Sequence, residues 1–326
     1  MRAIVCEGHG DVSVMRWREV DDPACGPGHL LLRVRATSVN RADLLQRAGR
    51  YPPPPGASPL LGLEAAGVVE EVGPGASGWR VGDEAMALLA GGGYAERVVV
   101  DARHALPIPR AVGLPAAGGV MEVFVTAWLN LVELGRLAPG ERVLIHGGAS
   151  GVGTAAVQLA RALGAEPWVT AGSPAKLEAC ARLGAAAGVD HRRDDFVARL
   201  KAAGGAQLVL DCVGAKYLAR NLEALADDGR LVVIGLLGGV TAELSLATLL
   251  ARRLSVIGST LRALPAERKA ALIARFRQRV WPLLDEGALR VVVDRVLPLT
   301  QVADAHRVLE RSEHVGKVLL EVREEG

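Results

Sequence analysis

The sequence predicts an α/β protein in which a doubly wound parallel sheet is joined to a β-rich domain. Between residues 142 and 259, short apolar runs alternate with stretches whose apolar residues recur every three or four positions, which is typical of a parallel sheet with helices on both faces. Before residue 120, Val- and Leu-rich runs are bounded by Gly and Pro clusters, which indicates strands joined by turns. A glycine-rich turn after the first central strand favours a Rossmann-type sheet.

In the first third of the chain, strands are expected over residues 30–36, 66–72 and 95–100. The four consecutive prolines at residues 52–55 cannot join a helix or a sheet interior, because proline has no amide hydrogen to donate. This segment is therefore expected to be a rigid surface loop.

The central region is expected to alternate strands with helices. The second helix has the clearest ends, since Ser173 is a natural N-cap, Pro174 suits the first helical position and Gly184 suits the stop. The expected strands cover residues 143–146, 167–170, 208–213, 231–235 and 254–258, and the helices cover 154–163, 174–183, 195–203 and 217–226.

The last part of the chain does not continue this alternation. One long amphipathic helix is expected after Leu264, then a strand over residues 291–296, a helix capped by Thr300, and a final strand over residues 317–322. We expect this segment to return to the first domain. The predicted domains are then residues 1–119 with 265–326, and residues 120–264.

The composition argues against several classes of function. The 38 basic and 36 acidic residues give a net charge of +2, and no basic–aromatic surface favours nucleic acid. No stretch of about 20 apolar residues lacks charge, so no membrane span is expected. The four cysteines lie far apart without a CxxC pair, and no signal-peptide pattern follows Met1. We therefore expect a cytoplasmic protein with reduced thiols and no metal.

The turn at residues 147–153, with sequence GGASGVG, joins a predicted strand to a predicted helix. Glycines let the backbone approach a pyrophosphate, and the amides at a helix N-terminus favour its charge. The alternative is a tight turn between packed elements, but the further strands after it favour a dinucleotide site.

The residues after the second central strand favour NADPH as the cofactor. An NAD site usually has Asp or Glu about 20 residues beyond the glycine turn, whereas this strand ends in Thr170, Ala171, Gly172 and Ser173. A 2′-phosphate needs cations and hydroxyl donors. Ser173 and Lys176 offer both, and His191 or Arg192 after the third strand could add to them, although Ser173 could instead be a plain helix cap and Lys176 a solvated side chain.

Several motifs resemble the medium-chain dehydrogenase/reductase superfamily over nearly the whole chain. They include SVNRAD at residues 38–43, GLEAAGVV at 62–69, GGYAE at 92–96, SGVG at 150–153 and GKV at 316–318. Within the superfamily the chain resembles the zeta-crystallin-type quinone oxidoreductases, in particular the stress-inducible subgroup, which shares the Tyr-Pro-rich loop at residue 51. The resemblance implies a GroES-like catalytic domain, a cleft active site, and a homodimer formed through the sheet edge near residues 254–261, with a tetramer as the alternative.

The resemblance also implies zinc-free chemistry. Zinc-dependent relatives have a catalytic Cys where this chain has Asn40, and a His where it has Leu63. Leucine cannot bind zinc, and an amide is a poor ligand compared with a thiolate. Zinc alcohol-dehydrogenase chemistry is therefore not expected.

The resemblance assigns catalytic roles to three residues. Tyr51 would hydrogen-bond the substrate oxygen, Asn40 would orient the nicotinamide ribose or carboxamide, and Thr126 would lie under the nicotinamide ring. The alternatives are a loop aromatic packed under the prolines, a turn or capping residue, and a structural helix residue. The residues matched to cofactor contacts are Ser150, Gly151, Val152, Gly172, Ser173, Lys176, His191, Val213, Gly214, Gly235, Leu236, Leu237, Ser259, Thr260 and Leu261.

These expectations describe an NADPH-dependent reductase of small quinones or conjugated carbonyl compounds. A quinone already accepts hydride readily, so its reduction needs mainly positioning and a donor near the carbonyl oxygen. Two alternatives remain open. One is an alkenal or enoyl reductase, for which a positioned acid would be essential. The other is a non-enzymatic protein that binds NADPH and serves a structural or RNA-binding role.

Overall fold

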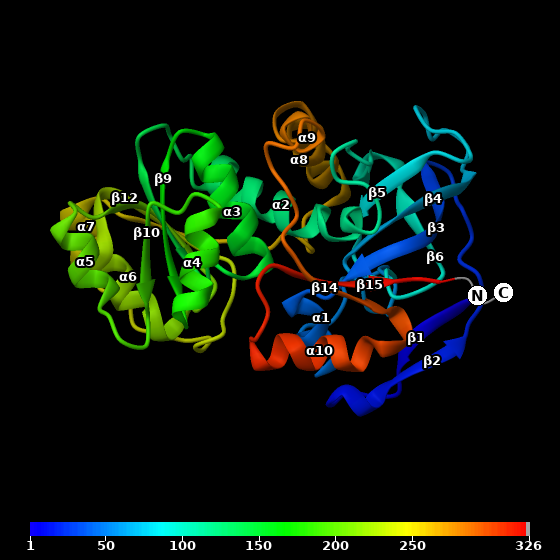
Figure 1. Ribbon diagram of the computed structural model, residues 1–326, viewed down its shortest axis with the longest axis horizontal. Coiled ribbons are helices and arrows are strands. Elements are labelled where there is room, and N and C mark those ends of the chain that lie inside the picture. Colours follow the sequence, from blue (N-terminus) through cyan, green and yellow to red (C-terminus); the bar gives the residue numbers. More distant parts are fainter. Residues whose placement is uncertain (324–326) are drawn as a thin grey trace. The chain divides into compact units, whose positions relative to one another are not determined.

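The computed structural model describes residues 1–323 and divides into two compact units (Figure 1). The first unit contains Met1–Val125 together with the chain from Arg262 onward, and the second contains Thr126–Leu261. The chain thus leaves the first unit once and returns to it.

The second unit is built on a six-stranded sheet in which every pairing is parallel. Val143, Leu144 and Ile145 are all buried, because a central parallel strand is covered on both faces. The predicted Rossmann-type sheet is confirmed. In spatial order its strands are β10 (Ala187–Asp190), β9 (Glu166–Ala171), β8 (Arg142–His146), β11 (Ala206–Asp211), β12 (Leu225–Val233) and β13 (Ser255–Gly258).

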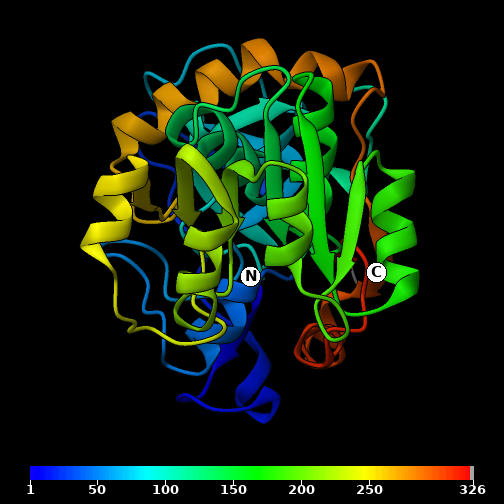
Figure 2. The ribbon, with the colours of Figure 1, turned by 90° about the vertical axis from the view of Figure 1, so that its left-hand side faces the viewer.

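Helices lie on both sides of these strands (Figure 2). Ser173 accepts a hydrogen bond from the Lys176 amide at 3.4 Å, Pro174 opens the helix, and Gly184 follows it with φ of +104°, so the predicted ends of this helix are confirmed. A further helix near residue 250 was not expected from the sequence. The helices are α3 (Gly151–Ala162), α4 (Pro174–Arg182), α5 (Phe196–Ala202), α6 (Leu218–Ala224) and α7 (Leu246–Arg252).

The first unit contains a two-stranded and a seven-stranded sheet. Leu30, Leu32 and Val34 alternate with more exposed residues and face its apolar core. The hairpin pairs β1 (Arg2–Cys6) with β2 (Met15–Glu19), and the larger sheet runs β14 (Val293–Pro298), β15 (Lys317–Glu321), β3 (His29–Ser38), β4 (Glu64–Val72), β5 (Glu84–Leu88) and β7 (Ala105–Pro107), with β6 (Arg97–Asp101) also paired to β3.

The return of the chain is visible in the pairing of β15 with β3, which are antiparallel with Leu319 opposite Ser38. Val302, Ala305 and Leu309 lie on one face of helix α10 (Val302–Arg311) and pack into the same core. Helix α1 (Arg41–Arg47) follows β3, and helix α2 (Met121–Trp128) continues into a π-helical segment, Leu129–Leu134.

Two predictions about the C-terminal segment are wrong. The long helix is divided into α8 (Ala266–Arg279) and α9 (Trp281–Asp285), because Pro282 has no amide hydrogen to continue the helical bonding. Thr300 caps nothing, since it lies inside a short 3-10 turn and Gln301 occupies the N-cap position of α10. Among the described residues, no helix combines the length and apolar character that a membrane crossing needs.

Candidate active site

The glycine turn follows β8 directly and leads into α3. A Cβ atom on Gly153 would lie 2.3 Å from the Gly147 carbonyl oxygen, and one on Gly148 would lie 2.5 Å from Val169 Cβ. The helix therefore starts so close to β8 and β9 that only glycine fits at these positions. Ser150 caps α3 by accepting from the Gly153 amide at 3.0 Å, which leaves its hydroxyl hydrogen to donate elsewhere. The first amides of α3 and its dipole suit a pyrophosphate.

The other residues that the sequence matched to the cofactor follow the remaining strands of this sheet. Because all six strands are parallel, their carboxyl ends share one edge, where ligands bind in open α/β sheets. The structure brings the predicted cofactor residues to that edge. Gly172, Ser173 and Lys176 follow β9, His191 follows β10, Val213 and Gly214 follow β11, Gly235, Leu236 and Leu237 follow β12, and Ser259, Thr260 and Leu261 follow β13.

The ends of β9 and β10 form a cationic cluster. A Cβ atom on Gly172 would lie 3.2 Å from His191 Nε2 and 3.4 Å from Arg192 Nε, so both side chains reach the start of α4. Strand β9 ends at Ala171 without a carboxylate, and the carboxylate of Asp190 accepts from the Arg192 amide at 3.0 Å. With Lys176 one turn into α4, these groups fit a ribose 2′-phosphate.

The loop after β11 differs from a simple ligand-binding loop. The amides of Val213 and Gly214 donate to the buried carboxylate of Asp211 at 2.7 and 3.0 Å, and Gly238 donates to the Val213 carbonyl at 2.6 Å. Burial raises the pKa of Asp211. The two amides are therefore committed within the protein, and so are the two carbonyl groups, since that of Gly214 accepts from the Tyr217 amide at 2.8 Å. Of these two residues, only the Val213 side chain remains for a ligand.

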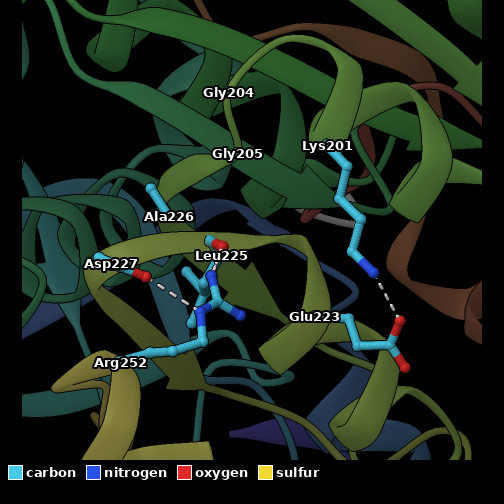
Figure 3. Close-up of a pocket in the computed structure, with 8 residues that line it drawn as sticks. All are labelled: Lys201, Gly204, Gly205, Glu223, Leu225, Ala226, Asp227 and Arg252. Atoms are coloured by element: carbon cyan, nitrogen blue, oxygen red, sulfur yellow. Dashed lines mark hydrogen bonds and ion pairs between the residues drawn. The ribbon is translucent and has the colours of Figure 1, made fainter.

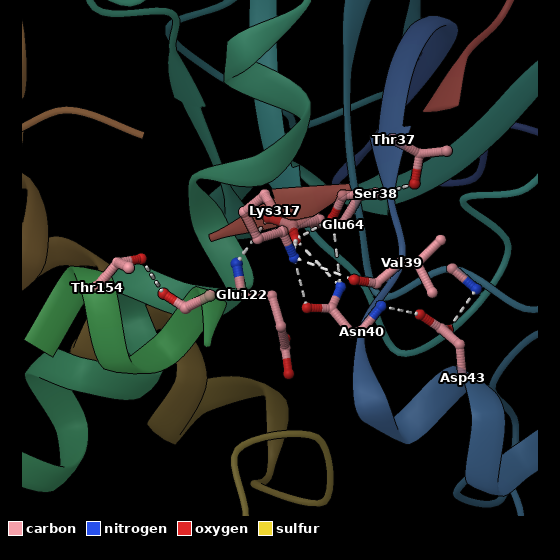
Figure 4. A network of polar contacts seen from close by, with 11 residues as sticks. Thr37, Ser38, Val39, Asn40, Asp43, Glu64, Glu122, Thr154 and Lys317 are labelled. Carbon is pink, nitrogen blue, oxygen red and sulfur yellow. Dashed lines mark hydrogen bonds and ion pairs between the residues drawn. The ribbon is translucent and has the colours of Figure 1, made fainter. Parts of the chain in front are cut away.

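In the first unit, Asn40 belongs to a buried polar network (Figure 4). Lys317 Nζ donates to Glu64 Oε1 at 2.9 Å and to Asn40 Oδ1 at 2.7 Å, while Asn40 Nδ2 donates to Glu64 Oε1 at 3.1 Å. Ser38 Oγ adds a bond of 2.5 Å to the same oxygen. The side chains of Lys317 and Glu64 are 2% and 1% exposed. Asn40 Nδ2 also donates to Ser38 Oγ at 3.4 Å, so both amide hydrogens are engaged and the side chain has a fixed orientation.

A second buried chain of polar groups supports α1. Asp43 accepts from the amides of Asn40 and Gly62 at 2.8 and 2.9 Å, and the Tyr94 hydroxyl also bonds it. Tyr94 contacts His306 Nε2 at 3.2 Å, and His306 Nδ1 contacts Arg47 at 3.1 Å. Burial raises the pKa of Asp43 to about 6 and, with the nearby Arg47, lowers that of His306 to about 3. His306 is therefore neutral and accepts from Arg47.

Tyr51 lies in the loop between α1 and β4, half-buried beside Arg262. The guanidinium carbon of Arg262 lies 5.3 Å from the centre of the Tyr51 ring. Arg262 is held by Gln46 at 2.7 Å and by the Ala90 carbonyl at 2.9 Å, and its buried Nη1 atom has no hydrogen-bond partner among the described residues. The ring of Tyr51 is thus supported by Arg262, and the prolines follow Tyr51 directly in the sequence.

Helix α2 carries Thr126 and one acidic residue that sequence reasoning missed. Thr126 is partly exposed, and its carbonyl accepts from Asn130 at 2.7 Å. Glu122, one turn earlier, donates its amide to Glu64 Oε2 at 2.9 Å. Burial, and then the carboxylate of Glu64, raise the pKa of Glu122 to about 8.

The donor atoms near Asn40 do not fit a catalytic zinc. Leu63 is buried and has no ligand atom, and the Asn40 amide is already bonded to Glu64 and Lys317. Within residues 1–323, no group of three or more His, Cys, Asp or Glu side chains is arranged to hold a metal ion.

A surface depression in the second unit is lined by Lys201, Gly204, Gly205, Glu223, Leu225, Ala226, Asp227 and Arg252 (Figure 3). Gly204 and Gly205 precede β11, Leu225 begins β12, and Arg252 ends α7 just before β13. Since the strands are parallel, these residues mark the amino-terminal edge of the sheet. Ion pairs of Lys201 with Glu223 and Arg252 with Asp227 line the depression. It is not part of the candidate site.

Sequence reasoning gave no role to Ser38, Glu64, Lys317, Glu122 or Arg262. A signal was present for two of them. Glu64 stands directly before the small and apolar residues AAGVV of β4, and Lys317 stands directly before the apolar run of β15. A charge at the start of a buried strand indicates a buried partner. Glu122 and Arg262 offered no comparable pattern.

Two known families match parts of the chain. Residues 26–110 match the alcohol dehydrogenase GroES-like domain, and residues 151–278 match the family described as zinc-binding dehydrogenase. The human synaptic vesicle membrane protein VAT-1 homolog is 33% identical over 340 residues, which cover 98% of this chain and 86% of that protein. A mycocerosic acid synthase-like polyketide synthase of Mycobacterium tuberculosis is 35% identical over 97% of this chain, but this chain spans only 15% of its length.

Solved structures resemble the whole chain. A Pseudomonas syringae quinone oxidoreductase has a TM-score of 0.87 at 28% identity, covering 98% of this chain and 99% of that one. A mycobacterial protein complexed with NADPH has a TM-score of 0.89 at 29% identity, covering 98% and 100%. The CurK enoyl reductase has a TM-score of 0.87 at 27% identity, covering 99% of both chains.

Proposed function

The chain belongs to the medium-chain dehydrogenase/reductase superfamily, and from this premise we propose that it is a zinc-independent, NADPH-dependent reductase of small quinones, of the zeta-crystallin type. The observation that carries the proposal is the pairing of two features. The cofactor edge of the sheet offers cations and hydroxyls where an NAD site has a carboxylate, and the network around Asn40 offers polar groups that do not fit a metal.

The second unit would hold the cofactor, which supplies a hydride when bound. Ser150, Gly151 and Val152 would bind the pyrophosphate through the amides and dipole of α3. Ser173, Lys176 and His191, joined by Arg192, would bind the 2′-phosphate. Their arrangement needs no carboxylate near the ribose, and the similarity to an NADPH-bound mycobacterial protein supports this assignment.

The first unit would position the substrate. The Tyr51 hydroxyl would donate to the quinone oxygen, with its ring held by Arg262. Asn40 would orient the nicotinamide end, and its bonds to Ser38, Glu64 and Lys317 would prevent it from turning. Thr126 would lie under the nicotinamide ring. A fixed donor near the substrate oxygen stabilises the negative charge that develops there.

The first test compares acceptors. We expect the protein to oxidise NADPH faster with 1,2-naphthoquinone than with 2-hexenal, and Tyr51→Phe to lower kcat with the quinone. Oxidation with neither acceptor, despite tight NADPH binding, would favour a non-enzymatic role. Unchanged kcat and KM in Tyr51→Phe and Asn40→Ala would remove both residues from the site.

Reduction of a conjugated alkene is the second candidate. It is favoured by Glu122, a partly exposed acid anchored to Glu64, because an enolate must receive a proton at carbon. Likeness to the CurK enoyl reductase supports the same alternative. Turnover of 2-hexenal that exceeds turnover of the quinone would favour it.

We further propose a homodimer formed through β13, with a tetramer as the alternative, in the cytoplasm. Strand β13 pairs only with β12 among the described strands, and Leu250 and Val256 nearby are 80% and 39% exposed. Sedimentation velocity should show a dimer that Val256→Glu converts to a monomer.

A further inference from the structure

Helix α2 buries most of its side chains but leaves two polar residues partly exposed. Met121, Val123, Phe124, Val125, Ala127 and Trp128 are buried, whereas Glu122 and Thr126 are not. Residues four positions apart lie on the same face of a helix, with their Cβ atoms about 5–6 Å apart. The acid therefore shares the polar face of α2 with Thr126, for which a cofactor contact is proposed.

The backbone of Glu122 is fixed to the network around Asn40. Its amide donates to Glu64 Oε2 at 2.9 Å, and the other oxygen of Glu64 accepts from Ser38, Asn40 and Lys317. The side chain of Glu122 points away from this network (Figure 4). Within residues 1–323, its carboxyl group forms no hydrogen bond or ion pair. The backbone of Glu122 is therefore held in place, while its carboxyl group is not used in a bond within the fold.

Charged groups on four elements or their borders surround this carboxyl group. Burial, Glu64 on β4 and Asp43 on α1 raise its pKa, while Lys317 on β15 and Lys269 on α8 lower it, and the outcome is about 8. Arg262, just before α8, also faces it, and Lys269 donates to the Arg262 carbonyl at 3.1 Å. The carboxyl group therefore carries a proton at neutral pH and can donate it.

We propose that Glu122 is the catalytic acid of this enzyme, donating its proton to the substrate as the hydride arrives; this rests on the proposed reductase function. In quinone reduction, the hydride brings two electrons and one hydrogen. The O–H bond of Glu122 breaks, its proton completes the hydroquinone, and water then reprotonates the carboxylate. With a conjugated enone, the hydride adds to the β-carbon and the proton from Glu122 ends on the α-carbon.

The test is Glu122→Gln, which keeps size and polarity but cannot titrate, beside Glu286→Gln, an exposed glutamate of the first unit. We expect Glu122→Gln to lower kcat for 2-hexenal by about 10²-fold or more, and for 1,2-naphthoquinone by less, since water can protonate oxygen. The wild-type kcat should fall as the pH rises through about 8, and this limb should vanish in Glu122→Gln. Glu122→Asp should retain it, and Glu286→Gln should match the wild type.

A second readout does not depend on turnover. Carbon NMR of the ¹³C-labelled carboxyl groups should show one glutamate that titrates near pH 8 in the wild type and is missing in Glu122→Gln. NADPH affinity, measured by fluorescence, should be unchanged in Glu122→Gln. Wild-type turnover and an intact alkaline limb in Glu122→Gln would overturn this inference and leave the reductase function standing. Absence of turnover in the wild type with either acceptor would overturn both.

Discussion

Glu64 is the residue on which the polar contacts of the first unit converge. Its two oxygens accept from three side chains and from one backbone amide, on three different segments of the chain. Breaking a buried ion pair costs far more than the pair contributes, because the remaining charge is left in a medium of low polarity. The pair of Lys317 with Glu64 thus fixes both the fold near Asn40 and the position of α2.

Replacing Lys317 tests this directly. Lys317→Met should lower the free energy of unfolding by about 3–5 kcal/mol, because Glu64 is left buried and uncompensated. Lys201→Met is the matched control. The side chains of Lys201 and its partner Glu223 are 55% and 57% exposed, so their ion pair should contribute about 0–1 kcal/mol. Urea unfolding measures both. Equal losses would show that the buried pair has no special role.

The role of the cations beside Gly172 can be tested by comparing the binding of NADPH with the binding of NADH. Lys176→Ala with Arg192→Ala should weaken NADPH binding by about tenfold or more, because hydrogen bonds to a charged phosphate contribute about 1.5–3 kcal/mol each. NADH binding should change little. Arg193→Ala, an exposed neighbour, is the control. Fluorescence titration gives the dissociation constants, and equal weakening for both cofactors would rule out a 2′-phosphate contact.

At the residue scale, the sequence identified Asn40 but not its partners. Glu64 lies 24 residues from Asn40, and Lys317 lies 277 residues away, so only the pairing of β3 with β4 and β15 brings them together. Arg192 was named as an addition to the phosphate site, and its proximity to Gly172 comes from the parallel pairing of β9 with β10. Whether the predicted residues bind NADPH stays a prediction.

The glycine turn and α3 act as one element. Gly153→Ala should disrupt it, because the new methyl group would lie 2.3 Å from one backbone oxygen and 2.6 Å from another. We expect a lower thermal midpoint and loss of NADPH binding. Gly26→Ala adds the same group where nothing lies within 4 Å and should change neither. Normal cofactor affinity in Gly153→Ala would mean that the turn does not hold the pyrophosphate.

Helices and strands whose apolar residues recur at regular spacing were predicted well, whereas those without such a pattern were not. Helices α3 to α5 cover a buried sheet, so their apolar residues recur every three or four positions. Strands β2 and β5, with sequences MRWRE and EAMAL, carry charged or helix-favouring residues and are strands only because β1 and β4 pair with them. The break at Pro282 could have been read from the sequence.

Over the whole molecule, buried histidines make stability depend on pH. His146 in the second unit and His306 in the first are buried, and burial lowers their pKa to about 4 and about 3. Their ordinary pKa in an unfolded chain is about 6.5. Below this value the unfolded chain binds protons that the folded chain does not, so stability present above pH 6.5 is lost as the pH falls.

His306→Gln should therefore reduce the acid sensitivity of the first unit. Between about pH 6 and pH 4.5, the free energy of unfolding should fall less steeply than in the wild type, by about 1.4 kcal/mol per pH unit. The pKa of Asp43 is raised to about 6, so this residue makes the free energy of unfolding rise as the pH falls. Its contribution is the same in both proteins and cancels in the comparison. His9→Gln, an exposed histidine, should leave the slope unchanged. Identical slopes in His306→Gln and the wild type would mean that His306 is protonated when folded.

The architecture of both units was predictable, because it follows from local patterns of apolar residues and turns. The activity is harder to predict from the sequence, since proteins similar to this chain include a quinone oxidoreductase, an enoyl reductase and part of a polyketide synthase. The proposed activity depends on a small set of side chains, among them Tyr51 and Glu122, which come from distant segments of the first unit.

The most direct measurement is the initial rate of NADPH oxidation by 1,2-naphthoquinone after treatment with a metal chelator, with NADH run beside it. We expect full turnover without metal and a clear preference for NADPH, since the cations near Gly172 suit a 2′-phosphate and Asn40 and Leu63 do not suit zinc. Activity that disappears with the chelator and returns with zinc, or that prefers NADH, would contradict the proposed function.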